Sequence, residues 1–166
     1  MTQTRRIYLF SFFYMFLMVM PVIIPFFNSL GLNMHEIYQL QALFGVAVMV
    51  FEIPTGYLCD LWGRKYTLVI GGFFSALGFS YLVFAKSYWG LVGFEIIVAF
   101  GTSFISGADV SLLYDSVDST ERKHKTHSLA NMQLATLGGE SLAAIFGGLL
   151  AIYSFTHVTV ANAIVS

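Results

Sequence analysis

Long apolar runs separated by short polar segments dominate the chain. No charged residue occurs from Ile7 to Met34, and further apolar runs follow with few interruptions. Each of the first five runs reaches the roughly 20 residues that a helix needs to cross a bilayer, and none shows the alternating polarity of membrane β-strands. The pattern predicts an all-α membrane protein, a polytopic bundle of transmembrane helices. The expected spans cover residues 7–30, 37–59, 66–85, 88–114 and 128–153, and a sixth begins at 158–166.

Composition narrows the function classes. Of the 166 residues, 57% are hydrophobic and 10% are charged, and the mean hydropathy is +0.77, whereas soluble domains carry about 25% charged residues. A net charge of −1 offers nucleic acid no basic surface. The single cysteine, Cys59, excludes an internal disulfide and a cysteine-based metal cluster, and no P-loop or zinc-protease motif occurs. We therefore expect no enzyme, no cofactor, no metal and no nucleic-acid partner.

The basic residues predict the orientation. Seven of the eight lie before the first span, between the second and third, or between the fourth and fifth, and only Lys86 falls on the other side. The positive-inside rule places the seven in the cytoplasm. We expect a multi-pass protein of the cytoplasmic (inner) membrane with a cytoplasmic N-terminus. The seven are Arg5, Arg6, Arg64, Lys65, Arg122, Lys123 and Lys125.

The turn between the second and third spans carries a distinctive motif, GYLCDLWGRK at residues 56–65. Gly56 lacks a side chain where two membrane helices have to approach, and Gly63 tolerates the positive φ that a short turn often needs. Asp60 lies at a helix end, where it can accept hydrogen bonds. Arg64 and Lys65 suit the anionic inner leaflet. The motif predicts a tight basic hairpin.

This motif resembles the signature of the major facilitator superfamily, G-x-L-x-D-x-x-G-R-K/R, and every fixed position is met. The preceding E-x-P-T-G at residues 52–56, the residues around Asp109 and the pair Glu121–Arg122 extend the resemblance over nearly the whole chain. The resemblance implies a transporter of twelve helices. Residues 1–166 would be its N-terminal half, cut within the sixth helix, and the C-terminal six-helix half would be absent.

In that family the signature residues form a conformational latch. The resemblance implies that Arg64 pairs with Asp115, that Asp60 meets the absent half, and that Gly56, Gly63 and Lys65 complete the latch. It further implies a secondary active transporter that moves a small organic solute by alternating access and is powered by protons.

The direction of transport stays open because two positions depart from the antiporter pattern. Glu95 stands where many drug–proton antiporters have arginine, and Ala143-Ala144 replaces a central Gly-Pro in the fifth helix. Efflux of a drug or metabolite by antiport is one expectation, and nutrient import by symport is the alternative. A truncated, non-transporting membrane protein with a regulatory or structural role is a third.

Four acids lie inside the predicted spans, namely Glu52, Glu95, Asp109 and Glu140. Such groups are costly in a bilayer and commonly mark paths for protons, ions or substrate, so each is a candidate for proton or substrate coupling. Glu95 and Asp109 would lie on one face of a continuous helix, roughly 21 Å apart. Glu52, next to Pro54, has a structural alternative in satisfying backbone groups. Asp109 also has a structural alternative, which is to cap or brace the signature turn at residues 56–65.

Two further patterns concern helix packing. Small residues recur every four positions in the fifth span, which predicts a face for close packing against a neighbouring helix. Pro21 and Pro25 each remove a backbone donor and predict a bend in the first span. The small residues are Ala135, Gly139, Ala143, Gly147 and Ala151.

Overall fold

The computed structural model describes residues 3–106, 108–116 and 122–165. The described part is helical and contains no strand, which confirms the all-α prediction. Its elements are α1 (Gln3–Tyr14), the 3-10 helix η1 (Met20–Val22), α2 (Ile23–Ser29), α3 (Met34–Trp62), α4 (Arg64–Leu82), α5 (Tyr88–Ser106), α6 (Asp109–Ser116), α7 (Arg122–Tyr153) and α8 (Phe155–Val165).

Within the described residues, three segments are long and apolar enough to cross a membrane by length and composition. They are Met34–Trp62, Tyr88–Ser116 and His124–Tyr153. The first predicted span, residues 7–30, is not one helix, because it is divided among α1, η1 and α2. This division corrects the single continuous helix expected from the first apolar run. In the fourth, residues 88–114, the junction of α5 and α6 includes residue 107, which lies outside the described residues, so the continuity of this span stays a prediction.

The first apolar run leaves the α-helical conformation at residues 15–19, before its prolines. Pro21 then lies in η1 and Pro25 in the first turn of α2. A first helical turn has backbone N–H groups without intrahelical acceptors, so proline costs no hydrogen bond there. The prolines therefore start new helical segments, whereas the sequence suggested that they bend a single helix.

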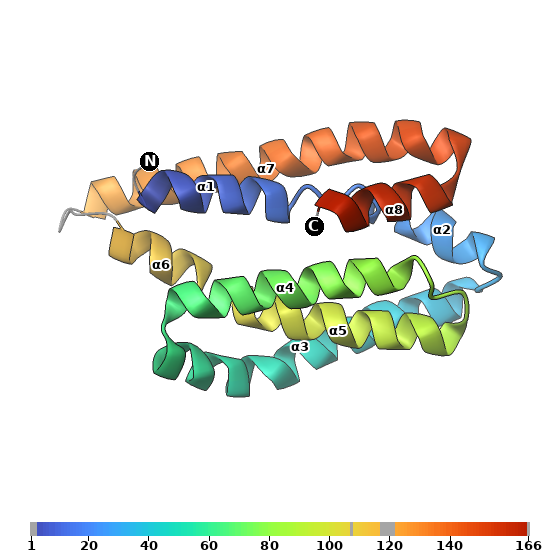
Figure 1. Cartoon of the computed structure of the whole chain (residues 1–166), viewed down its shortest axis with the longest axis horizontal. Helices are drawn as coiled ribbons and strands as arrows, with labels where there is room; N and C mark the ends of the chain where they lie inside the picture. Colours follow the sequence, from blue (N-terminus) through green and yellow to red (C-terminus); the bar gives the residue numbers. More distant parts are fainter. Residues whose placement is uncertain (1–2, 107, 117–121, 166) are drawn as a thin grey trace.

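Helices form two groups that α8 connects (Figure 1). In one group α5 packs against both α3 and α4, and in the other α7 packs against α1. Helix α8 contacts α4 and α7, and the short α6 contacts both α1 and α4. Phe27, Phe79 and Phe94 are among the largest fully buried side chains.

Glycine makes the closest helix crossings possible. A β-carbon on Gly101 of α5 would lie only 2.8 Å from the backbone nitrogen of Ser75 in α4. In α7, β-carbons on Gly139 and Gly147 would overlap the backbone carbonyl oxygens of Phe12 and Met18. Ala143, between these two glycines, is buried. The small-residue face of α7 thus lies against the first apolar segment, at the backbone-to-backbone distance that small residues permit.

The two ends of the bundle differ in charge. The starts of α1, α4 and α7 and the end of α6 lie at one end, which we call the basic end (Figure 1). Arg5, Arg6, Arg64 and Lys65 belong to it, because they lie at or near the starts of α1 and α4. Lys86 follows the opposite end of α4. The arrangement is consistent with the sidedness predicted from the basic residues.

Candidate functional site

The α3–α4 turn at the basic end consists of a single residue. Gly63 follows the last residue of α3 and precedes the first residue of α4, with φ 87° and ψ 144°. Its N–H donates to the carbonyl of Cys59 at 2.9 Å. Its carbonyl accepts hydrogen bonds from the backbone N–H of Thr67 at 3.3 Å and from the Thr67 hydroxyl at 3.1 Å. Glycine is required here because L-residues rarely adopt this backbone conformation.

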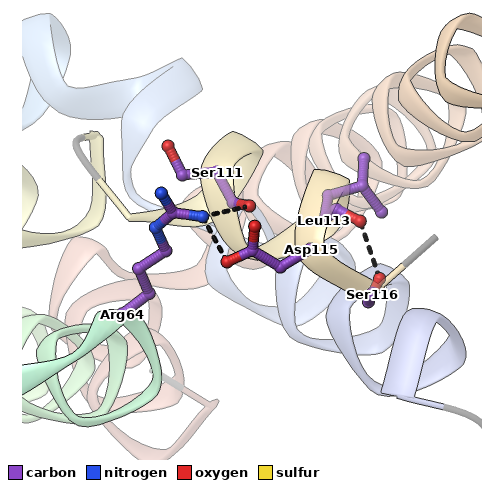
Figure 2. A network of polar contacts seen from close by, with 5 residues as sticks. All are labelled: Arg64, Ser111, Leu113, Asp115 and Ser116. Carbon is purple, nitrogen blue, oxygen red and sulfur yellow. Dashed lines mark hydrogen bonds and ion pairs between the residues drawn. The ribbon is translucent and has the colours of Figure 1, made fainter. Parts of the chain in front are cut away.

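Arg64, the first residue of α4, reaches across to α6 (Figure 2). Its Nη1 donates to the backbone carbonyl of Ser111 at 3.0 Å and forms an ion pair with the carboxylate of Asp115. Asp115 lies in the last turn of α6, where the partial negative charge of the helix end also favours a cation. One guanidinium nitrogen therefore holds both a side chain and a main-chain group of α6.

The ion pair is accessible to water. The side chains of Arg64 and Asp115 are 39% and 59% exposed. Ion pairs with such exposure contribute only about 0.2–1 kcal/mol to stability. The contact therefore has a specific geometry, but breaking it costs little free energy. A reversible contact between two helices needs both properties.

A second polar contact joins α6 to α1. The hydroxyl oxygens of Thr4 and Ser116 lie 3.2 Å apart. Figure 2 shows the other contact of Ser116, whose hydroxyl donates to the carbonyl of Leu113 at 2.8 Å. Helix α6 is thus bound to α4 through Arg64 and to α1 through Thr4. Sequence reasoning missed Thr4, Ser111 and Ser116, because a carbonyl acceptor or a single hydroxyl carries no distinctive sequence signal.

Three of the other four predicted latch residues, Asp60, Gly63 and Lys65, line an open cavity of about 460 Å³ at the same turn. Asp60 and Lys65 line it together with Arg64 and Asp115. Both Asp60 and Lys65 are exposed, and within the described part of the chain neither has an ion-pair partner. Gly56 differs from expectation, because a β-carbon there would meet nothing within 4 Å. The close helix approach predicted at Gly56 is absent from the described residues.

Glu95 is the most buried of the four candidate acids, at 4% exposure. The side-chain amide of Gln41, on α3, donates to its Oε1 at 3.5 Å. Within the described residues this is the one hydrogen bond found for the carboxylate, and no ion pair is found there. Glu95 therefore lies at the contact of α3 and α5 with a single long polar contact.

The remaining acids have different environments. Glu52 is exposed and accepts a hydrogen bond from the Ser106 hydroxyl at 3.0 Å, so its carboxylate contacts a side chain and not the backbone near Pro54. Asp109 accepts from the N–H of Val110 at 2.6 Å at the start of α6. Glu140 is exposed, and the described residues provide it with no hydrogen bond.

The structure does not gather these acids into one site. Glu95 lies in α5 and Asp109 in α6, and residue 107 between these helices lies outside the described residues, so the shared face of the two acids stays a prediction. The hydrogen bond of Asp109 comes from the next residue, Val110, at the start of α6, and the described residues show no hydrogen bond between Asp109 and the turn at residues 56–65. No group of three or more potential metal ligands occurs in the part of the chain that the structure describes. Glu121 of the predicted Glu-Arg pair lies outside the described residues.

Comparison with known proteins places this geometry in context. The sequence model of the Major Facilitator Superfamily matches residues 7–166. A curated protein of Buchnera aphidicola subsp. Schizaphis graminum (strain Sg), named as an uncharacterized transporter, is 31% identical over 118 residues. The match covers 68% of this chain and 29% of that relative, so the chain spans less than a third of the relative's length.

Proposed function

We propose that this chain, which belongs to the major facilitator superfamily, is part of a secondary active transporter that moves a small organic solute across a membrane by alternating access. The contact of Arg64 with Ser111 and Asp115 carries the proposal. It joins the single-residue turn between α3 and α4 to α6 at the basic end, where a latch between two conformations has to act. We propose that this end faces the cytoplasm.

The latch works through an inexpensive contact. Because the Arg64–Asp115 pair is partly hydrated, water replaces its hydrogen bonds at little cost when the helices separate. The Arg64–Asp115 pair would be formed in one conformational state of the transporter and broken in the other. Asp60, exposed at the same cavity, would contact a second six-helix unit of the complete protein. The Arg64–Asp115 pair would set the position of α6, and Asp60 would set the contact between the two halves.

Proton coupling is assigned to Glu95. A buried carboxylate without a neighbouring cation is costly, and binding a proton removes its charge. Gln41 can donate to the ionised carboxylate and accept from the protonated one, because an amide has both a donor and an acceptor. Glu95 could therefore change its protonation state while keeping one polar partner. The exposed Glu52 and Glu140 lack this combination of burial and adaptable contact.

The test uses the complete protein, reconstituted into liposomes that contain a pH-sensitive dye. A panel of small organic solutes is added, and solute-dependent proton movement is recorded in both directions across oriented vesicles. Movement of solute and proton in opposite directions indicates efflux by antiport, and movement in the same direction indicates a symporter. A protein that transports none of the solutes, by this readout or by solute exchange, would favour the non-transporting role.

Two variants sharpen the test of coupling. Glu95→Gln should reduce solute-dependent proton movement to background while solute exchange without a gradient continues. The control is Glu36→Gln, because Glu36 is an exposed acid in the first turn of α3 that accepts a hydrogen bond from the backbone N–H of the N-cap residue Asn33. Glutamine keeps that acceptor, so the control should couple as the natural protein does. Undiminished coupling in Glu95→Gln would remove Glu95 from the proton path.

A further inference from the structure

A cleft opens between α1, α4 and α6, and it shares Lys65 and Leu112 with the cavity at the α3–α4 turn. Its volume is about 430 Å³. Phe10 of α1, Leu68 and Val69 of α4, and Leu112 of α6 form most of its wall. The cleft therefore offers an apolar surface between two helices that contact each other little, with α6 lying between them at the basic end (Figure 1).

Two cations flank this apolar wall. Arg6 from α1 and Lys65 from α4 line the cleft, and no acidic residue is among the described residues that line it. Both side chains are exposed, and the ion pair found in the described part of the chain involves neither of them. The cleft thus combines two unneutralised charges from separate helices with an apolar wall.

We propose that this cleft binds one anionic phospholipid, with the phosphate between Arg6 and Lys65 and an acyl chain along Phe10, Leu68 and Val69. Basic pockets between membrane helices on the cytoplasmic side suit anionic lipid headgroups. Long basic side chains place their charge at the membrane surface while their stems cover apolar surface. A soluble anion would satisfy the two cations but leave the apolar wall unused, and a neutral lipid would leave the cations unpaired.

Lys65 gives the bound lipid a route to the latch, because this residue lines both the cleft and the cavity that contains Arg64 and Asp115. A lipid phosphate that contacts Lys65 would hold its ammonium group on the cleft side. The lipid would then stabilise the position of α4 relative to α1 without touching the Arg64–Asp115 pair. Lipid binding itself is measured below without any transport assay, so its failure is separate from failure of the transport proposal.

The experiment measures lipid adducts of the full-length protein in non-ionic detergent by native mass spectrometry. The protein is titrated with dioleoyl phosphatidylglycerol and, separately, with dioleoyl phosphatidylcholine. We expect a one-to-one adduct that favours phosphatidylglycerol. Arg6→Gln and Lys65→Gln should each weaken it about fivefold, the loss expected for one basic residue at an anionic headgroup.

Arg5→Gln is the matched control. Arg5 adjoins Arg6 on α1 and is equally basic and exposed, but it does not line the cleft. Its replacement should leave the adduct unchanged. Equal weakening by Arg5→Gln and Arg6→Gln would overturn the proposal in favour of diffuse attraction to the basic end. Equal binding of both lipids would overturn the role of the cations.

Two further arms test the apolar wall and the source of the phosphate. Val69 is 65% exposed, so Val69→Trp fills the cleft without disturbing the core. The variant should lose the adduct although both cations remain, and an unchanged adduct would contradict the proposal. Glycerol 1-phosphate, the headgroup without its chains, should not displace the lipid at equal concentration. Displacement would indicate a site for a soluble anion instead. Helical circular dichroism and a monodisperse elution profile verify that each variant folds.

Discussion

The side-chain Oδ1 of Asn162 accepts a hydrogen bond from the backbone N–H of Val19 at 3.2 Å. Val19 lies where the first apolar segment has left its helix, and both residues are almost completely buried. A backbone donor freed within an apolar environment needs an acceptor from elsewhere in the protein. Helix α8 provides that acceptor, so the break in the first segment depends on a residue near the other end of the chain.

Replacement of Asn162 by leucine should therefore destabilise the break. The N–H of Val19 would lose its acceptor, at a cost of about 1–3 kcal/mol for an unsatisfied buried group. Removal of the Asn162 amide nitrogen, which has no partner among the described residues, offsets part of that cost. Hydrogen exchange over residues 15–22 should accelerate. The exposed Asn28 on α2 provides the control, since Asn28→Leu removes no described hydrogen bond. Slow exchange in Asn162→Leu would show that the contact is dispensable.

Adjacent glycines in α7 should respond differently to alanine. A methyl group on Gly147 would overlap the Met18 carbonyl, which belongs to the backbone and cannot rotate away. We expect Gly147→Ala to lower the free energy of unfolding by about 1–3 kcal/mol, the usual cost of overpacking. Gly148 has nothing within 4 Å, so Gly148→Ala should be neutral or slightly stabilising. Unfolding in mixed detergent micelles measures both. Equal stability of the two variants would refute close packing of α7 against the first segment.

The two signature glycines at the basic end form another matched pair. Gly63 has φ 87°, and a side chain there would strain the backbone by about 1–3 kcal/mol. Gly56 lies within α3, where a β-carbon would meet nothing within 4 Å. Gly63→Ala should therefore reduce thermal stability, whereas Gly56→Ala should maintain or raise it in this chain. Loss of transport by Gly56→Ala without loss of stability would place its function at a contact with a second helical unit.

Exchange of the latch charges should rescue function only in part. Arg64→Asp and Asp115→Arg should each abolish transport by the complete protein, because each variant places two like charges together. The double variant restores the ion pair but not the hydrogen bond from Arg64 to the Ser111 carbonyl. We expect a transport rate between those of the single variants and the natural protein. Stability should change by less than about 1 kcal/mol throughout, since the pair is exposed. A double variant that transports no better than the single variants would contradict the proposed pairing of Arg64 with Asp115.

Local features were the predictable part of the fold and of the site. The apolar runs of α3, α4, α5 and α7 indicated helices because length and polarity alone make a helix the stable form in lipid. Gly63 was predictable because a one-residue turn needs an unusual φ. The structure also places Arg64 beside Asp115, as the signature implied. The functional role of that contact stays a prediction.

Features set by distant residues were not predictable. The break at residues 15–19 depends on Asn162, which no window of sequence around the break contains. The burial of Glu95 depends on α3 and the side chain of Gln41, so hydropathy along α5 could not distinguish it from the exposed Glu140.

The one-residue connection at Gly63 limits how the two helices can be threaded through a membrane. Helices α3 and α4 run in opposite directions, and no loop between them is long enough to cross a bilayer. When both helices cross a bilayer, the end of α3 and the start of α4 therefore have to lie on the same side of it. The charges of Asp60, Arg64 and Lys65 then stay together on one side, so none of them can change sides without the other two.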